Sequence, residues 1–491
     1  MKKQKMRPYV VAFVFLSVLY CVAMLAIWRS GVSYIDDYGR AISGKGWTSD
    51  FNRFSSSALS FLLLQMNLSL VDVSPWSQVA AMAIVAIASV VIVSCFGDVK
   101  KPWHVILGGF VALCPFVVSC WLYKFDAPCM ALALLASVAP LLFVNRGGRL
   151  SFFVASFVGC MVMLTSYQAF SGVFPAMCLG VIFNMHLNRK ELAPLLRRLG
   201  WGLLAYVTAL LVFKFLLPLP VGYRSIEMWG FSDLLVGVIS NARDLLVTVF
   251  VKMAWGWRIV TCAVLGVFLV SIGMLSGSWK RKVLNICLGM LFIILAATVS
   301  YGLYILLAEA PVNARSFVGL GCVLSMLALM TAVNTERANS GSIVSRAAAI
   351  PSAILLYMFF IYAFVIGNAL VAQEEYARYR NETLARDMAK LYSAEELAAK
   401  RVQIQGAIDY APAVQHVADL YPLTYDIIDD SQKGLSYLFW GSWNLRFDYG
   451  LEYDHLGALD ERWDCGSMSQ KLDGYYHAIY SDDARLCVVV K

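Results

Sequence analysis

The sequence predicts an all-α polytopic membrane domain followed by a small α+β domain, and two observations lead to this. Of the 491 residues, 60% are hydrophobic and only 15% are charged, whereas soluble domains are roughly half apolar and a quarter charged. The apolar residues fall in runs of about 20, the length of a helix that crosses a bilayer core. These runs stop near residue 372. We therefore place the membrane domain at 1–372 and a C-terminal domain at 373–491.

The apolar runs predict about eleven transmembrane helices. They are expected at 8–28, 77–97, 104–122, 127–144, 150–167, 169–187, 200–218, 259–278, 283–307, 316–334 and 347–372. The stretch 219–258 is expected to be an amphipathic helix at the membrane surface, because Arg243 and Asp244 lie at its centre. A charge at mid-bilayer costs about 3 kcal/mol or more.

The distribution of Lys and Arg predicts the orientation of these helices. Alternate short loops are basic, which is typical of cytoplasmic loops. They are the N-terminus, 100–101, 146–149, 189–198, 280–282 and 337–346. An odd number of spans then puts the C-terminal domain and the long loops 29–76 and 219–258 outside the cell membrane. The basic excess is topological, so we expect no nucleic acid partner.

The C-terminal domain is expected to contain both helices and strands. Residues 374–400 predict a helix that continues from the last span, and 412–421 predicts another. Strands are expected at 401–406, 435–440 and 484–491. Residues 373–491 carry 20 Asp and Glu against 12 Lys and Arg. Cys465 and Cys487 lie here, and an oxidising compartment would let them form a disulfide.

The stretch "SYIDDYGR" places Asp36 and Asp37 beside Arg40 directly after the first apolar run. The region 51–78 that follows is amphipathic enough to lie along the membrane interface. An acid in such a loop suits a general base that acts on a polar substrate while the other substrate is a lipid. The alternative is a hydrated loop whose acids only face water.

Further polar residues recur at the predicted outer ends of the spans. They are Asp126, Tyr167, Gln168 and Arg315. Ordinary interfacial anchoring is the alternative for such positions, above all for the tyrosine. An arginine at the start of a span is well placed to hold a lipid phosphate with two hydrogen bonds. We therefore favour a phosphate-binding role for Arg315.

Several of these motifs resemble a known family. "YIDDYGRAISGKGW", "NRF" and "DVSPWSQ" resemble the opening of the phage-type O-antigen glucosyltransferases, which convert bacterial serotype. "LYKFDAPCMALALL" and "SYQAFSGVF" are similar to the next landmarks of that bacteriophage family, and the resemblance covers about the first 190 residues. Many members have Gly-Arg where this chain has Asn52 and Arg53, so only Arg53 is carried over.

The resemblance implies the GT-C architecture and an inverting hexosyltransferase. It implies transfer of glucose from undecaprenyl phosphate to O-antigen of lipopolysaccharide, at the periplasmic face of the inner membrane, downstream of a donor synthase and a flippase. Asp36 or Asp37 would be the catalytic base. Arg40, Arg53 and Arg315 would bind the donor phosphate, and Asp126, Tyr167 and Gln168 the substrates. No cofactor and no metal ion are expected.

Three alternatives stay open at this point. Trp440, Trp443 and Trp463 of the C-terminal domain either stack on acceptor sugars or belong to its core. An O-antigen polymerase would share the location and the substrates but would link repeat units. A flippase or transporter for a lipid-linked sugar would need charged residues inside the spans along a pathway, which the sequence does not show.

Overall fold

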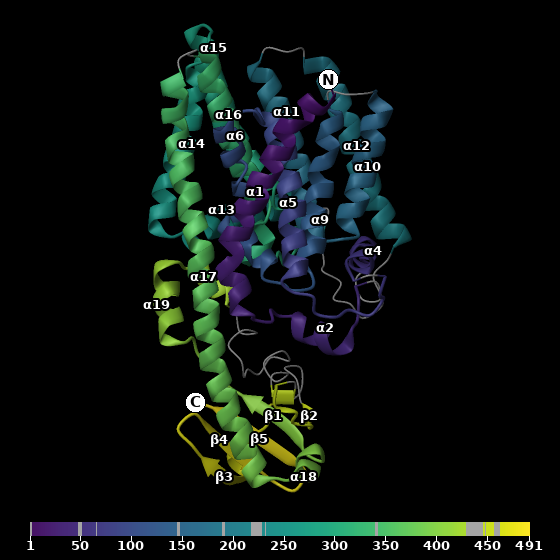
Figure 1. Ribbon diagram of the computed structural model, residues 1–491, viewed down its shortest axis with the longest axis vertical. Helices are drawn as coiled ribbons and strands as arrows, with labels where there is room; N and C mark the ends of the chain where they lie inside the picture. The colour runs from purple at the N-terminus through teal and green to yellow at the C-terminus, as the bar shows by residue number, and fades with distance from the viewer. Residues whose placement is uncertain are drawn as a thin grey trace. The chain divides into compact units, whose positions relative to one another are not determined.

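The computed structural model describes residues 2–47, 52–64, 66–144, 148–188, 192–217, 228–230, 232–338, 342–428, 445–446, 448–455 and 462–491. The chain forms two compact units, which are described separately. The first comprises Met1–Leu25 and Gly44–Ala363, and the second comprises Ala26–Ser43 and Phe364–Lys491. The predicted boundary at 372 falls inside α17 (Ser342–Leu391), a single continuous helix (Figure 1).

The first unit is built from apolar helices with α16 at its centre. The most apolar window of α16 is 94% buried, whereas that of α15 is 22% buried. Its other helices are α1 (Lys2–Ser30), α4 (Phe54–Leu63), α5 (Trp76–Phe96), α6 (Pro102–Leu107), α7 (Phe110–Leu113), α8 (Pro115–Val118), η1 (Ser119–Trp121), α9 (Ala127–Val138), η2 (Ala139–Phe143), α10 (Arg149–Leu164), η3 (Gln168–Gly172), α11 (Val173–Leu187), α12 (Leu192–Leu216), α13 (Leu234–Lys252), α14 (Trp255–Gly273), α15 (Trp279–Val299), η4 (Gly302–Leu306) and η5 (Ala314–Phe317), with α16 at Leu320–Ala338.

Within the described residues, nine helices are long and apolar enough to cross a membrane, or ten if one bent pair is a single span. The predicted segment 104–122 is that pair: Pro102–Leu113 and Pro115–Trp121 meet at 53°. A proline inside a helix removes a backbone donor and bends the chain. The predicted segments 127–144 and 150–167 form shorter apolar helices, Ala127–Phe143 and Arg149–Leu164. By length and composition, the described residues therefore contain fewer candidate membrane spans than the eleven or so that the sequence predicts.

Helix α13 is the candidate span that the sequence analysis placed at the membrane surface. It meets the length and composition criteria although Arg243 and Asp244 lie in it. Asn241, in the middle of α13, donates to the carbonyl oxygens of Ile305 at 3.0 Å and Leu307 at 2.8 Å. These acceptors belong to the segment that follows α15. The middle of α13 therefore lies beside the end of a neighbouring helix, and the length and composition of α13 do not support the predicted surface placement.

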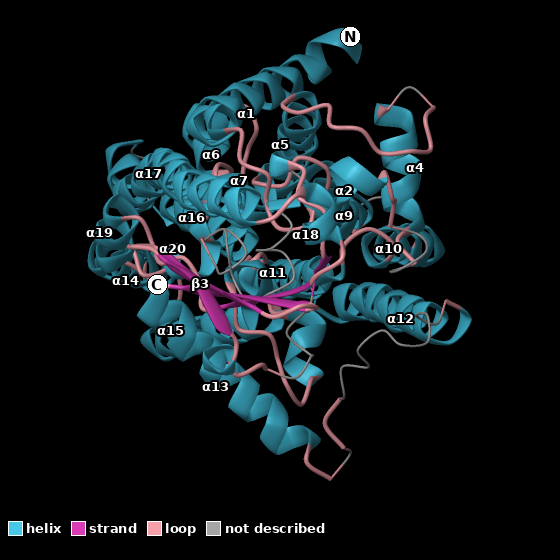
Figure 2. Cartoon of the chain, turned by 90° about the horizontal axis from the view of Figure 1, so that it is seen from below, coloured by secondary structure: helices cyan, strands magenta, loops and turns pink. Residues whose placement is uncertain are grey.

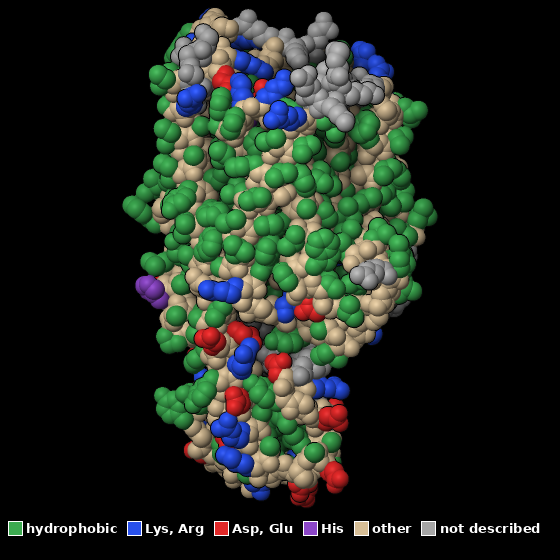
Figure 3. Space-filling view, in the orientation of Figure 1, with side chains coloured by type: hydrophobic (Ala, Val, Ile, Leu, Met, Phe, Trp, Pro, Cys, Tyr) green, Lys and Arg blue, Asp and Glu red, His purple; other side chains and the backbone are tan. Residues whose placement is uncertain are grey.

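The surface of the helical unit separates charge from apolar side chains. Figure 3 shows Lys and Arg gathered at the end of this unit that carries the N-terminus, and hydrophobic side chains along its sides. Apolar sides suit a bilayer, and a basic end suits cytoplasmic loops. The structure thus supports a multi-pass membrane protein.

The second unit holds a mixed five-stranded sheet, seen in magenta in Figure 2. Its order is β2-β1-β5-β4-β3, with β1 parallel to β2 and β5, and the other pairs antiparallel. Leu384 and Met388 of α17 pack on Ile404, Leu486 and Val488 of the sheet. The elements are α2 (Asp37–Ser43), α18 (Ala394–Ala398), β1 (Arg401–Gln405), α19 (Pro412–Leu420), α20 (Thr424–Ile427), β2 (Asp454–His455), η6 (Cys465–Ser467), β3 (Ser469–Asp473), β4 (His477–Ser481) and β5 (Arg485–Val490).

The small sheet agrees with the predicted α+β character of the C-terminal region. The predicted strands 401–406 and 484–491 correspond to β1 and β5, and the predicted helix 412–421 corresponds to α19. The predicted strand 435–440 lies outside the described residues. Strands β2, β3 and β4 were not expected. Most side chains of β3 are exposed, so its sequence "SQKLD" lacks the apolar alternation that indicates a strand.

The start of the loop that follows α1 belongs to the second unit because the end of α1 packs closely on α17. A Cβ atom on Gly367 would lie 2.5 Å from the carbonyl carbon of Ala26, so only glycine allows this approach. Arg29 Nη2 donates to Asn368 Oδ1 at 2.5 Å. These contacts place the loop that starts at Gly31 in the same unit as the C-terminal sheet.

Cys465 and Cys487 are joined by a disulfide, with a Cα–Cα distance of 5.7 Å. The bond links η6 to β5 and closes a loop between residues 22 apart. Closing such a loop stabilises a fold by about 3 kcal/mol. We expect the double change Cys465→Ser and Cys487→Ser to lower the unfolding free energy of this unit by that order, measured by limited proteolysis in urea. Wild-type protein alkylated without reductant should show neither thiol, and labelling of both would contradict the prediction.

Candidate functional site

Arg53 lies at the start of α4, next to the turn that follows α10. Its guanidinium carbon lies 5.2 Å from the centre of the Tyr167 ring, and its Nη2 is 3.4 Å from Gln168 Oε1. The hydroxyls of Ser55 and Thr165 are 2.7 Å apart and hold α4 against this turn. The structure thus brings together three residues that the sequence analysis proposed separately.

Arg315 lies in η5, at the start of the buried helix α16. It donates through Nη1 to the hydroxyl of Tyr123, and its guanidinium carbon is 5.6 Å from the centre of that ring. Tyr123 is fully buried. Phe317 fixes η5 by packing on Phe116 and Tyr301, each with ring centres 5.6 Å apart. The arginine is therefore held on a rigid, apolar base.

Electrostatics connect the two arginines. Burial raises the pKa of Tyr304 above its usual value, and the guanidinium groups of Arg53 and Arg315 oppose that shift. Burial likewise raises the pKa of Tyr167 above its usual value, and the charges of both arginines oppose this shift. Both tyrosines lie outside the nine candidate spans. Both arginines therefore act on the same two phenols, and we call Arg53, Arg315, Tyr123, Tyr167 and Tyr304 the arginine–tyrosine cluster.

The backbone of η4 brings Tyr304 into this cluster. Gly302 has φ +66°, and a Cβ atom there would lie 2.5 Å from the backbone nitrogen of Gly172. The next residue, Leu303, donates its N–H to Ser171 Oγ at 3.0 Å. The η4 segment therefore sits directly on η3, beside Tyr167. Sequence analysis missed Tyr123 and Tyr304, because tyrosines at span ends normally indicate interfacial anchors.

Asp126 has a structural partner. It is 4% exposed, and its Oδ1 accepts a hydrogen bond from Trp47 Nε1 at 2.6 Å. Trp47 packs with Leu70, Phe125 and Cys129. Asp126 therefore anchors the later part of the loop between α1 and α5 to the start of α9. A contact of this acid with substrate stays a prediction.

The acid pair lies in the second unit, at the start of α2. Asp37 is completely buried, and its Oδ2 accepts from the backbone N–H of Tyr34 at 2.9 Å. Asp36 is only partly buried. Ile35 has φ +49°, a strained conformation for a β-branched residue, and such strain concentrates at functional sites. The pair thus divides into an anchored acid, Asp37, and a more accessible acid, Asp36.

More acids surround this loop than the sequence indicated. Burial raises the pKa of Tyr38 above its usual value. The charges of Glu374 and Asp448 raise this pKa further, whereas the charge of Arg378 lowers it. Burial and Glu374 also raise the pKa of Asp448. Arg378 Nη2 is 3.3 Å from Glu374 Oε1. Residues from α17 and from the chain before β2 therefore share the electrostatic environment of α2. Arg40 is buried within α2, where its N–H donates to the carbonyl oxygen of Asp36 at 3.0 Å.

Comparison with known proteins identifies the family. The family model described as glucosyl transferase GtrII matches residues 25–332, more than half of the chain. This chain belongs to the GtrII glucosyl transferase family. The resemblance found in the first 190 residues is thereby confirmed and extends further along the chain. No curated protein and no solved structure matches it.

Membership of the GtrII family makes the chain a glycosyltransferase. The matched region contains the acid pair of α2 and all five residues of the arginine–tyrosine cluster. It ends within α16, so Glu374, Asp448 and the sheet lie beyond it. The GtrII match therefore covers the residues proposed for base and phosphate, but not the disulfide-containing sheet.

Proposed function

We propose that this GtrII glucosyl transferase moves glucose from undecaprenyl-phosphate glucose to O-antigen repeat units at the periplasmic face of the bacterial inner membrane. The modified lipopolysaccharide would change the serotype. The arginine–tyrosine cluster carries the proposal: two guanidinium groups act on the same half-buried phenols at the ends of apolar helices. Such a site suits a phosphate that is attached to a lipid.

The cluster would bind and stabilise the leaving group. When the bond between C1 of glucose and the phosphate oxygen breaks, negative charge grows on the polyprenyl phosphate. Arginine stays charged at all relevant pH values and binds phosphate oxygens in pairs. Donors held in place before the reaction stabilise such charge without reorganisation. Arg53 and Arg315 would do this, with the tyrosine hydroxyls as neutral donors.

Asp36 would act as the catalytic base in an inverting GT-C mechanism. It takes the proton of an acceptor hydroxyl, whose oxygen attacks C1 on the face opposite the phosphate. A polyprenyl phosphate leaves as an anion, so no acid is needed to protonate it. Asp37 is buried and bonded to Tyr34, so it would hold the loop in shape. The reaction needs no cofactor, but it depends on a synthase and a flippase for the donor.

An exposed aromatic surface of the second unit would contact the acceptor polysaccharide. Tyr475 is 86% exposed and Tyr379 is 57% exposed. Both rings pack edge-on against Tyr476, at 4.8 and 5.8 Å between centres, and the guanidinium of Arg380 lies 4.4 Å from the Tyr476 centre. Exposed apolar patches that are held in place usually mark binding sites. Sugar rings stack on such aromatic faces.

The structure describes only one of the three tryptophans that were proposed to stack on acceptor sugars. Trp463 packs against the buried cluster of Cys465, Met468 and Cys487, and Arg485 covers its ring at 5.5 Å. These contacts favour a core role for Trp463. Trp440 and Trp443 lie outside the described residues.

We expect Tyr475→Ala to raise the KM for polymeric O-antigen about fivefold with little change in kcat. Loss of one aromatic contact costs about 1 kcal/mol, and tenfold in an equilibrium is 1.4 kcal/mol. Leu420→Ala, a change at another exposed apolar side chain of this unit, is the matched control. An unchanged KM in Tyr475→Ala would remove this surface from the proposal.

The orientation of the chain has its own test. If the basic loops are cytoplasmic and the C-terminal unit is periplasmic, alkaline phosphatase fused after Lys491 should be active. The same reporter inserted after Lys101 should be inactive. A fluorescent green fluorescent protein fusion after Lys491, together with inactive phosphatase there, would reverse the assignment.

The host polysaccharide decides between this function and its alternatives. O-antigen should be isolated from cells with and without the protein and analysed for composition, linkage and chain length. The proposed glucosyl transfer adds a glucose branch and leaves chain length unchanged. A polymerase would change the chain-length distribution, and a flippase would alter only the supply of lipid-linked sugar. Either of those outcomes would refute the proposal.

A further inference from the structure

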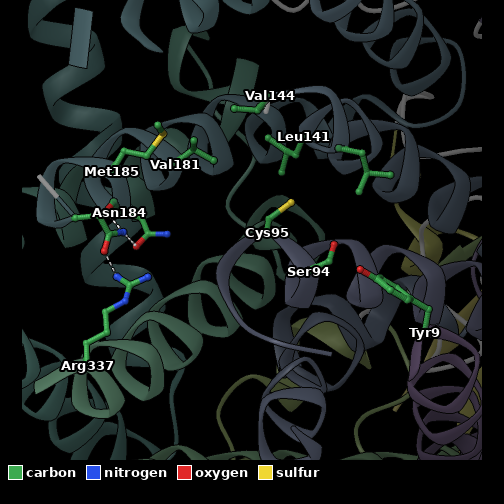
Figure 4. Close-up of a pocket in the computed structure, with 11 residues that line it drawn as sticks. Tyr9, Ser94, Cys95, Leu141, Val144, Val181, Asn184, Met185 and Arg337 are labelled. Atoms are coloured by element: carbon green, nitrogen blue, oxygen red, sulfur yellow. Dashed lines mark hydrogen bonds between the residues drawn. The ribbon is translucent and has the colours of Figure 1, made fainter. Parts of the chain in front are cut away.

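A cavity of ≈ 300 Å³ lies between helices of the helical unit (Figure 4). It is separate in sequence from the arginine–tyrosine cluster. Its walls come from α1, α5, α11, α16 and the segment around η2. The residues that carry the argument are Tyr9, Ser94, Leu142, Asn184, Asn188 and Arg337. Nothing in the proposed transfer reaction uses this cavity.

One wall of the cavity is an ordered polar chain. Arg337 Nη1 donates to Asn188 Oδ1. The amide nitrogen of Asn188 donates in turn to the carbonyl oxygen of Asn184 at 2.6 Å and to its Oδ1 at 3.1 Å. Figure 4 shows this chain running along the cavity to the guanidinium group. Both amides are thereby oriented, and the guanidinium group, with five N–H donors, keeps further donors for a ligand.

The charge of the cavity is positive. Among the described residues that line it, Arg337 is the only charged one. In the described part of the chain no carboxylate pairs with Arg337. Glu336, its neighbour in sequence, bonds instead to Lys101 Nζ at 2.6 Å and lies 3.3 Å from His104 Nε2. The carboxylate of Glu336 acts on Arg337 only electrostatically, with no hydrogen bond between the two in the described part of the chain, so an arginine backed by oriented amides can still bind an anion directly.

The rest of the lining is apolar, which restricts the kind of anion. Leu142 is 38% exposed and Tyr9 is 41% exposed, and Val10 and Val14 continue this exposed face along α1. The hydroxyls of Tyr9 and Ser94 add two polar groups on the side away from Arg337 (Figure 4). A small hydrophilic anion gains nothing from such walls. A phosphate attached to acyl chains uses both the polar chain and the apolar face.

The position along the helices agrees with a lipid headgroup. The lining residues lie near the cytoplasmic ends predicted from the basic loops, close in sequence to Lys100, Lys101, Arg149 and Arg346. Basic pockets between helices on this side bind anionic headgroups, and the anionic leaflet attracts nearby Lys and Arg. The basic loops would attract anionic lipids to this side of the membrane, and the cavity would bind their headgroups.

We propose that this cavity binds the phosphate group of an anionic phospholipid through Arg337 and Asn188, with the acyl chains along the exposed face of α1. The site is a lipid-binding site and takes no part in the transfer chemistry. Its loss should leave the rate of glucosyl transfer in detergent unchanged. Its occupancy should stabilise the helical unit.

The test uses the purified full-length protein in a neutral detergent. Thermal unfolding and native mass spectrometry are followed during titration with phosphatidylglycerol, phosphatidylcholine or inorganic phosphate. Phosphatidylglycerol should raise Tm and remain bound, and the two other probes should do neither. Arg337→Gln should weaken phosphatidylglycerol binding at least tenfold, whereas Lys280→Gln, a basic residue outside the cavity lining, should not.

Two milder variants keep the proposal testable if Arg337→Gln does not accumulate. Tyr9→Phe should weaken phosphatidylglycerol binding a few-fold, and Leu142→Trp should block binding by filling the cavity. If phosphatidylcholine stabilises the protein as much as phosphatidylglycerol does, the cavity does not recognise the charge of the headgroup. If inorganic phosphate alone stabilises it, the ligand is a soluble anion. Either of these two outcomes would overturn the proposed lipid site. So would an equal loss of phosphatidylglycerol binding in Lys280→Gln and Arg337→Gln.

Discussion

Replacing Asp36 with Asn should lower glucosyl transfer by about 10²–10⁴-fold, the usual contribution of a positioned general base. The amide keeps the size of the carboxylate but cannot take a proton. Asp37→Asn should cost less, because the buried amide oxygen can still accept from the N–H of Tyr34. Transfer is measured in membranes with a lipid-linked glucose donor, after protein amounts have been matched.

Glu382→Gln is the control for this comparison, because Glu382 is an exposed acid of the same unit that pairs only with Arg386 among described residues. It should retain wild-type activity. If Asp36→Asn and Asp37→Asn both keep full activity, the acid pair is a solvated loop and the base lies elsewhere. A larger loss in Asp37→Asn than in Asp36→Asn would exchange the two roles.

Replacing Arg315 with Gln should lower kcat by about 10²–10³-fold, as expected when a donor to developing charge is removed. Arg315→Lys should recover only part of the loss, because lysine lacks the planar pair of donors. Arg53→Gln should be similarly damaging, and the double change should cost less than the product of the two. In the proposed mechanism the two guanidinium groups act as a unit on the same phosphate, and such effects are not additive.

The control for the arginine series is Arg386→Gln, since that side chain is exposed on α17. Each variant is assayed for kcat and for the KM of the lipid donor. If Arg315→Gln raises only the KM, the cluster binds the donor equally in the ground state and the transition state. Full kcat in both single variants would remove the cluster from the mechanism.

The helical unit was largely predictable because a bilayer imposes runs of about 20 apolar residues. Hydropathy does not detect where such a run breaks. The segment 104–122 bends at Pro115, and the segment 127–144 passes from α9 into η2. With the short helix α10, these breaks remove three expected spans, and α13 adds one, which leaves nine candidates within the described part of the chain.

The C-terminal sheet was predicted only where its strands are apolar. β1 and β5 are central strands with mostly buried residues. β3 is an edge strand with mostly polar, exposed residues, and hydrogen bonds to β4 define it. Such pairing is not encoded in local periodicity, so sequence patterns could not show it.

The candidate site was predicted in part. The acid pair, Arg53, Tyr167, Gln168 and Arg315 were selected because they are polar residues at the ends of apolar runs. Tyr123 and Tyr304 follow the same pattern but could not be distinguished from interfacial anchors. Glu374 and Asp448 join the environment of Tyr38 from far along the chain. Only the fold brings such residues together.

The most direct test of the central claim reconstitutes the purified protein in liposomes with radiolabelled undecaprenyl-phosphate glucose and O-antigen acceptor. We predict that labelled glucose appears on the O-antigen in a ratio of one to one with released undecaprenyl phosphate. Its anomeric configuration should be opposite to that in the donor. Transfer from a nucleotide sugar but not from the lipid-linked donor, or a product that retains the donor configuration, would contradict the account.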